Sequence, residues 1–233
     1  METKIYKIDM GLNGRNFKDK PKVNSPLGRN KGSFYSISNF KRGLEDFFLE
    51  GNLYFIDSQE SLDTFKNLLG NQWIGGKQYY LSHPKNETSL IEARCFHEYI
   101  LMEQIGEIAT YLHKNLHCNK VLVNIKEGND FSSFKELNIE EDKLSEFGRV
   151  TLIDSKSLEL TFYGDEEENF KKNTCFWIDD FKELTTKLSN QEKREFSYTL
   201  NLDNSFGMSS KIAKKIGINP SWLNKIVIEF KFK

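Results

Sequence analysis

The longest stretch of helical periodicity in this chain lies between Ser89 and Leu116. Its apolar positions recur every three or four residues, as they do in a helix that buries one face. The stripe consists of Leu90, Ala93, Phe96, His97, Ile100, Leu101, Ile108 and Leu112. A compact run, KVLVNI at residues 120–125, follows and predicts a strand. A long helix with a strand directly behind it is typical of a fold in which helices pack on a sheet.

The N-terminal half repeats this alternation of strands and helices. Residues 53–56 and 78–81 predict strands, because they are short apolar runs next to turn residues. Helices are expected from Ser38 to Gly51 and from Asp57 to Gly70, since each stretch begins with a capping residue and ends at a glycine. This order of elements favours βαβ-like packing.

The C-terminal half is richer in strands. Helices are expected over residues 180–188 and 209–217. Strands are expected over residues 149–153, 158–163, 174–178, 196–202 and 226–232, and the last two alternate apolar with polar residues. We therefore predict an α+β fold: a mixed β-sheet with helices packed on it, a βαβ-like N-terminal half and a more antiparallel C-terminal half.

The chain has 233 residues and no Pro- or Ser-rich linker, so one domain over residues 1–233 is expected. Residues 1–35 are interpreted as a basic arm, mobile or loosely looped, because they are rich in Gly, Asn and Pro. No apolar run is long enough for a transmembrane segment or a signal peptide. The three cysteines are scattered, which favours a reducing, cytoplasmic location.

The charge is unevenly distributed along the chain. Residues 1–45 hold ten Lys or Arg and four Asp or Glu, a net charge of +6. Residues 205–233 hold six Lys and a single acid, Glu229, a net charge of +5. The whole chain has a net charge of −1, so the middle carries −12. Basic ends of this kind attract nucleic acid or an anionic membrane, but solvated surface lysines are the simpler and favoured interpretation.

The segment SSKIAKKIGINPSWLNKIVI, residues 209–228, resembles the helix-turn-helix pattern of bacterial repressors. Ala213 stands where the first helix needs a small residue, and Gly217 stands where the turn belongs. The resemblance implies DNA binding, with lysines on the phosphates at Lys211, Lys214, Lys215 and Lys225. The tail after Lys225 alternates like a strand, however, which favours the interpretation of a helix that packs across the sheet between two strands.

Two groups of residues are candidates for a metal site. His113 and His117 lie four positions apart on the long helix, with Cys118 adjacent, as zinc ligands often do. The alternative is that a histidine near a helix C-terminus interacts favourably with the helix dipole. The acidic turn at residues 165–168 lacks the ligand spacing of a calcium loop. No metal site is therefore expected.

A catalytic site is supported by candidate residues but by no recognisable motif. His83, Glu92, His97 and Glu98 are candidates for general acid–base chemistry, with His83, His97 and Glu98 the strongest of them. No P-loop, dinucleotide fingerprint, serine elbow or catalytic-cysteine signature occurs, and no cofactor is expected.

We therefore expect a non-enzymatic intracellular protein that acts through a macromolecular partner, either a protein or a nucleic acid. The frequent use of Lys, Asn, Ile and Phe is typical of bacterial or phage genomes, for which an accessory stress or phage-defence role is one interpretation. The alternatives are a DNA-binding protein that uses residues 209–228 and a hydrolase with a His/Glu site.

Overall fold

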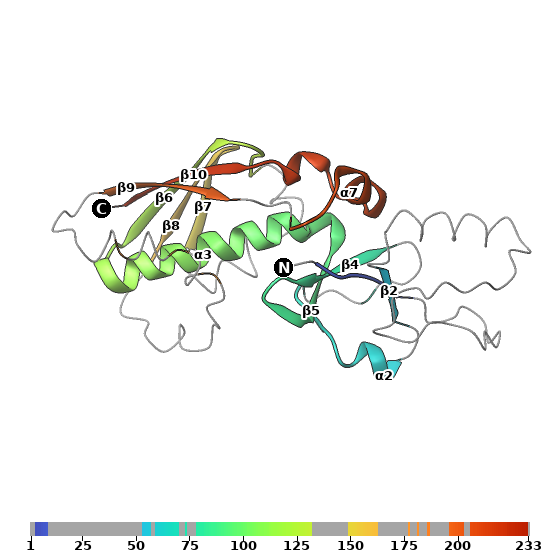
Figure 1. Cartoon of the computed structure of the whole chain (residues 1–233). Helices are drawn as coiled ribbons and strands as arrows, with labels where there is room; N and C mark the ends of the chain where they lie inside the picture. The colour runs from blue at the N-terminus through green and yellow to red at the C-terminus, as the bar shows by residue number, and fades with distance from the viewer. Residues whose placement is uncertain are drawn as a thin grey trace, which may run out of the picture. The chain divides into compact units, whose positions relative to one another are not determined.

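The computed structural model describes residues 3–8, 53–56, 59–69, 73, 78–131, 149–162, 177, 181, 186, 196–202 and 206–232. Its contacts divide the chain into two compact units. Unit 1 comprises Met1–Phe96 and Ser205–Leu223, and unit 2 comprises His97–Asn204 and Asn224–Lys233. Each unit is built around its own sheet, and the fold is α+β (Figure 1).

Unit 1 contains sheet A, whose strand order is β2-β1-β4-β5-β3. The strands are β1 (Ile5–Ile8), β2 (Leu53–Ile56), β3 (Lys66–Asn67), β4 (Tyr79–His83) and β5 (Asn86–Glu92). The pairs β1/β2 and β3/β5 are parallel, whereas β1/β4 and β4/β5 are antiparallel. The sheet is therefore mixed, as the sequence predicts.

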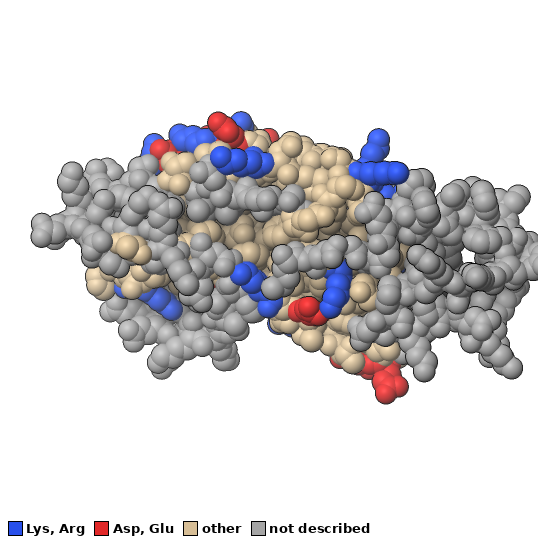
Figure 2. All heavy atoms as spheres, viewed as in Figure 1, with Lys and Arg blue, Asp and Glu red and all other residues tan. Residues whose placement is uncertain are grey.

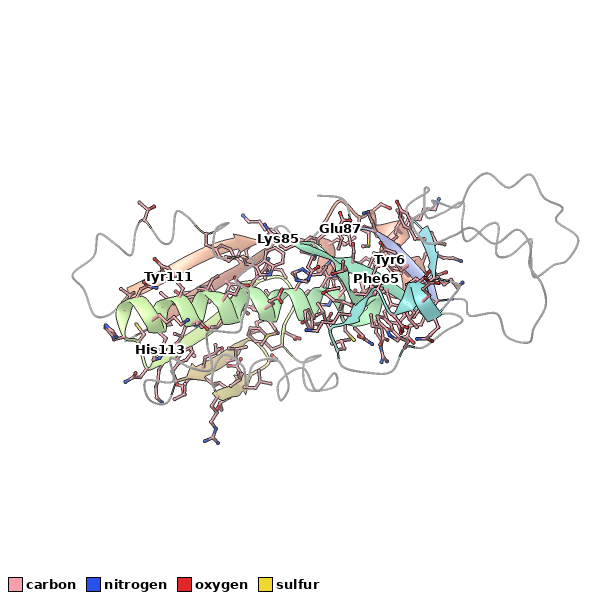
Figure 3. All side chains as sticks on the ribbon, turned by 90° about the horizontal axis from the view of Figure 1, so that it is seen from below. Tyr6, Phe65, Lys85, Glu87, Tyr111 and His113 are labelled. Atoms are coloured by element: carbon pink, nitrogen blue, oxygen red, sulfur yellow. The ribbon has the colours of Figure 1, made fainter. Side chains whose placement is uncertain are left out.

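One face of sheet A carries an aromatic core. Tyr6 is 2% exposed, and its ring centroid lies 5.1 Å from that of Phe65 and 5.4 Å from that of Tyr54 (Figure 3). Burial is the main reason that the pKa of Tyr6 is raised above its usual 10.0. The rest of this core consists of Ile8, Ile56, Leu62, Tyr80, Leu90 and Trp73. Large aromatic side chains bury much apolar area each and stabilise such a small sheet.

Two helices are shorter than the sequence predicts. Helix α2 covers Gln59–Leu62 alone, and the chain then enters β3. The long helix begins only at Phe96, after β5 and the 3-10 helix η1 (Ala93–Cys95), so the expected start at Ser89 is wrong. The reason is tertiary: Ile91 pairs with Leu81 of β4 while its neighbour Leu90 is buried on the opposite face.

Unit 2 contains sheet B, which is antiparallel throughout and has the strand order β7-β8-β6-β10-β9. The strands are β6 (Lys120–Glu127), β7 (Arg149–Asp154), β8 (Ser157–Thr161), β9 (Phe196–Leu202) and β10 (Ile226–Phe232). The inner face holds Val121, Val123, Ile125, Leu158, Leu160, Ile226, Ile228 and Phe230, all at most 3% exposed.

Helix α3 (Phe96–Leu116) lies along the inner face of sheet B (Figure 1). Residues Leu101, Ile105, Ile108 and Leu112 share one helix face and are at most 1% exposed. The other faces of α3 are also buried from Phe96 to Thr110. In the part of the chain that the structure describes, no helix is long and apolar enough to cross a membrane.

Several expected elements fall outside the described residues. These are the helix from Ser38, the acidic turn at residues 165–168, the strand at 174–178 apart from Trp177, the helix at 180–188 apart from Phe181 and Thr186, and the basic arm apart from residues 3–8. The prediction of one domain over residues 1–233 concerns how the two units act together and stays a prediction.

Candidate functional site

Helix α7 (Ser210–Ile216) in unit 1 carries the lysines that the sequence associates with phosphate binding. The hydroxyl of Ser209 caps the helix by accepting the N–H of Ile212 at 3.3 Å. Gly217 ends it with φ 90°, a left-handed conformation that glycine adopts without strain. Seven residues between two caps therefore form a short helix with a defined orientation of its side chains.

The two sides of α7 differ completely in character. Ile212, Ala213 and Ile216 are at most 7% exposed and attach the helix to its unit. The three lysines of the helix, Lys211, Lys214 and Lys215, are all exposed. Figure 2 shows lysine side chains protruding where Figure 1 places α7. No acidic residue occurs between Ser205 and Ile228, so the helix is purely basic in its sequence neighbourhood.

The helix-turn-helix resemblance is wrong in its second helix. After Gly217 the chain forms only η4 (Pro220–Leu223), a four-residue 3-10 helix, before it enters β10. The reason is that Ile226, Ile228 and Phe230 are fully buried in a strand that pairs with β6 on one side and β9 on the other. Lys225 is exposed but precedes that strand in unit 2, so a recognition helix does not carry it.

The histidine candidates for a metal site lie at the C-terminal end of α3. The Nδ1 atom of His113 lies 2.9 Å from the carbonyl oxygen of Cys118, and its ring stacks on Phe162 with centroids 4.5 Å apart. Figure 3 shows His113 and Tyr111 projecting from opposite sides of this end of the helix. His117 is exposed and has φ 53°, which reverses the chain.

Cys118 completes this helix terminus. Its Sγ donates to the carbonyl of Leu116 at 3.8 Å, and burial raises the pKa of the thiol above its usual 9.0. A buried neutral thiol is a poor metal ligand, because metals bind the thiolate. Among the residues described, no group of three or more His, Cys, Asp or Glu side chains is placed to hold a metal ion.

The candidates for acid–base catalysis are buried. His83 is 1% exposed in β4, and its Nδ1 accepts the backbone N–H of Lys85 at 3.1 Å. His97 and Glu98 are 1% and 5% exposed at the start of α3, in the other unit. Glu92 forms an ion pair with Arg94. The hydrolase alternative therefore stays a prediction.

Sequence reasoning missed a buried polar contact in unit 2. The backbone N–H of Trp177 donates to Glu107 at 2.7 Å, and its indole N–H donates to Glu103 at 2.8 Å. All three residues are at most 5% exposed. The available signal was the pair of glutamates one turn apart on a helix. This signal does not identify the partner, because Trp177 lies 70 residues away along the chain.

The comparisons with known proteins identify no relative. No protein-family model matches the chain, and no curated protein or solved structure is significantly similar to it. The function has to be inferred from the residues themselves. Of the sites predicted from the sequence, the lysines of α7 combine exposure, a shared helix and a single chemical character.

Proposed function

We propose that this protein is a non-enzymatic binding protein whose helix α7 binds the phosphate backbone of a nucleic acid. The supporting observation is the division of α7 into a buried apolar side and an exposed side that carries Lys211, Lys214 and Lys215. This proposal keeps the nucleic-acid partner expected from the charge distribution and replaces the helix-turn-helix geometry with a single basic helix.

The spacing of the lysines suits a line of phosphates. Lys214 and Lys215 follow Lys211 by three and four positions, so the three side chains share one face of the helix. Neighbouring positions on such a face have Cβ atoms about 5–6 Å apart. Duplex DNA presents about one negative charge per 1.7 Å of its axis, so all three ammonium groups find a phosphate within reach.

The chemistry of the face predicts binding that does not depend on sequence. Ammonium groups are point charges that neutralise phosphates, whereas base identity is read by side chains in the grooves. The fold of α7 also favours cations, because Lys214 and Lys215 occupy its last turn, where the helix dipole is negative. Positive charge at this end therefore stabilises the helix.

The test is binding of the full chain to a labelled random duplex DNA over a series of salt concentrations. Three phosphate contacts predict a slope of about −2.7 in log K against log salt, or roughly a 40-fold loss of affinity between 50 and 200 mM salt. The variant Lys214→Glu/Lys215→Glu removes two contacts and should reduce the magnitude of the slope by about 1.8.

The matched control is Lys66→Glu/Lys85→Glu, which changes the net charge equally at two other exposed lysines of unit 1. The proposal expects this control to retain the wild-type slope. Equal losses in both double variants would show that net charge, and not α7, governs the binding. Absence of binding by the wild-type chain at 50 mM salt would contradict the proposal outright.

A further inference from the structure

Strand β7 forms one edge of sheet B (Figure 1). In the described part of the chain, β8 is the only strand that pairs with it. The edge of a sheet presents backbone N–H and C=O groups with which another strand can pair. The sequence of β7, RVTLID, begins with a cation and ends with a carboxylate, and its four inner residues include three that favour strands through a branched Cβ atom.

The apolar layer of sheet B is only partly covered at this edge. Val150 pairs with Leu160 of β8, on the inner face of the sheet. Leu152 pairs in the same way with Leu158. The two leucines of β8 are at most 1% exposed, whereas Val150 and Leu152 are half-buried. Ile153 is 56% exposed, and it is the one large apolar side chain that is exposed among the described residues. A further strand along β7 would therefore bury apolar surface.

The two ends of β7 carry opposite charges on the same face of the sheet. Arg149 pairs with Thr161 of β8. Asp154 pairs with Ser157, which lies four positions from Thr161 and therefore on the same, outer face of β8. A bulge between Leu152 and Asp154 brings the carboxylate to this face. Arg149 and Asp154 are both exposed. Such a strand is complementary to a copy of itself that runs in the opposite direction.

We propose that two copies of this chain form a symmetric dimer in which their β7 strands pair antiparallel and join the two copies of sheet B into one continuous sheet. In the register centred on Thr151, Val150 of each copy lies opposite Leu152 of the other, on the inner face. On the outer face, Arg149 of each copy comes within reach of Asp154 of the other. The proposal goes beyond nucleic-acid binding and does not depend on it.

The other edge of sheet B suits β7 less well. Strand β9 forms that edge, and its sequence, FSYTLNL, contains no charged residue to pair with Arg149 or Asp154. Pairing of β7 with β9 of another copy would also be heterologous, and such contacts continue into filaments unless a ring closes. Pairing of β7 with itself closes after two copies, as in the commonest class of symmetric oligomer.

The test is sedimentation equilibrium of the full chain without nucleic acid. A pair of six-residue strands buries less than the roughly 1,200–2,000 Å² of a standard interface, so we expect a monomer–dimer equilibrium in the micromolar range. Arg149→Asp places like charges next to each other at both ends of the paired strands. We expect dimerisation to weaken by about 10- to 100-fold, because two ion pairs become two repulsions. Asp154→Arg should have a similar effect.

Charge exchange separates this interface from a structural role of either residue within one chain. The double variant Arg149→Asp/Asp154→Arg restores both ion pairs and should dimerise like wild type. An equimolar mixture of the two single variants should form heterodimers, because one strand then carries two carboxylates and the other carries two guanidinium groups.

A second variant of Asp154 preserves the turn after β7. Asp154 also accepts the backbone N–H of Lys156 at 2.7 Å, and Asp154→Asn keeps such an acceptor. This variant should dimerise about 3- to 10-fold more weakly than wild type, because both ion pairs are lost without any repulsion. It provides the measurement if Asp154→Arg does not fold.

Lys66→Asp in unit 1 is the control, because it changes the net charge as much as Arg149→Asp does at an exposed site outside sheet B. It should dimerise like wild type, and circular dichroism establishes that each variant is folded. Recovery of the dimer in the double variant and in the mixture supports the inference. A wild-type chain that stays monomeric in the micromolar range, assemblies larger than a dimer, or a dimer that no charge change affects would overturn it. The α7 lysines are tested separately, by duplex binding.

Discussion

Replacing Trp177 by Phe tests the buried contact between this residue and α3. The change removes the indole N–H that donates to Glu103 at 2.8 Å but retains an aromatic ring and the backbone N–H that donates to Glu107. A hydrogen bond to a charged group contributes about 1.5–3 kcal/mol to stability. The smaller ring adds a packing loss, so we expect the free energy of unfolding to fall by roughly 2–4 kcal/mol.

The size of this effect follows from burial. Trp177 is 4% exposed and Glu103 is 5% exposed, so water does not readily replace the missing donor. A carboxylate left short of a donor in such surroundings costs more than a neutral acceptor would. The assay is urea unfolding of the full chain, followed by far-ultraviolet circular dichroism and extrapolated linearly to zero urea.

A double-mutant cycle isolates the hydrogen bond from the packing loss. In a Glu103→Gln background the acceptor is neutral, so Trp177→Phe should cost about 1 kcal/mol less than it does in the wild-type chain. In a Glu107→Gln background its cost should be unchanged, because Glu107 accepts the backbone N–H that both side chains leave in place. Equal costs in the wild-type and Glu103→Gln backgrounds would refute the assignment of this energy to the indole.

Two further predictions concern the ends of helices. Gly217→Ala should lower the free energy of unfolding by about 1–2 kcal/mol in the same urea assay, because φ 90° is costly for a residue with a Cβ atom. No atom lies within 4 Å of the added Cβ atom, so the expected cost comes from the backbone conformation. A change below about 0.3 kcal/mol would contradict the assignment of Gly217 as a left-handed cap. Burial raises the pKa of the Cys118 thiol above its ordinary value of 9.0. The contribution of the thiol to stability is therefore complete below pH 9.0. It is lost as the pH rises through the raised pKa, because the thiol of the unfolded chain ionises first. The difference in unfolding free energy between wild type and Cys118→Ala should therefore shrink between pH 8 and pH 10, and a constant difference would show that the thiol titrates normally in the folded chain.

Strands whose two faces have different environments were predicted well from the sequence. Residues 196–202 and 226–232 alternate apolar with polar side chains, and both form strands of sheet B with those bounds. The strand at residues 120–125 is confirmed and extends to Glu127. Alternation identifies such strands because one side meets the core and the other meets solvent.

Residues 89–92 show where the same reasoning fails. Leu90 and Ile91 are both 0% exposed, on opposite faces of a strand that is buried on both sides. The sequence of such a strand does not alternate between apolar and polar residues. Its apolar residues were therefore assigned to the helical stripe that follows. Only the pairing of β5 with β4, Ile91 opposite Leu81, separates the strand from the helix.

The candidate sites divide in a similar way. The position of the lysines on helix α7 was predicted from the sequence, because the spacing of apolar residues in a short amphipathic helix indicates which side is exposed. The helix-turn-helix alternative fails in its second helix, whereas the strand that the sequence favoured there is confirmed, because Ile226, Ile228 and Phe230 are buried in the middle of sheet B.

The sequence by itself determined the α+β class, the strands of the C-terminal half and the basic character of α7, since each depends on neighbours within a few residues. Only the tertiary structure decided which residues form one sheet rather than another, that Trp177 meets Glu103 and Glu107, and that Glu229 lies between Lys126 and Lys231. These contacts join residues far apart in the chain, and their energies arise only when burial and strand register bring the partners together.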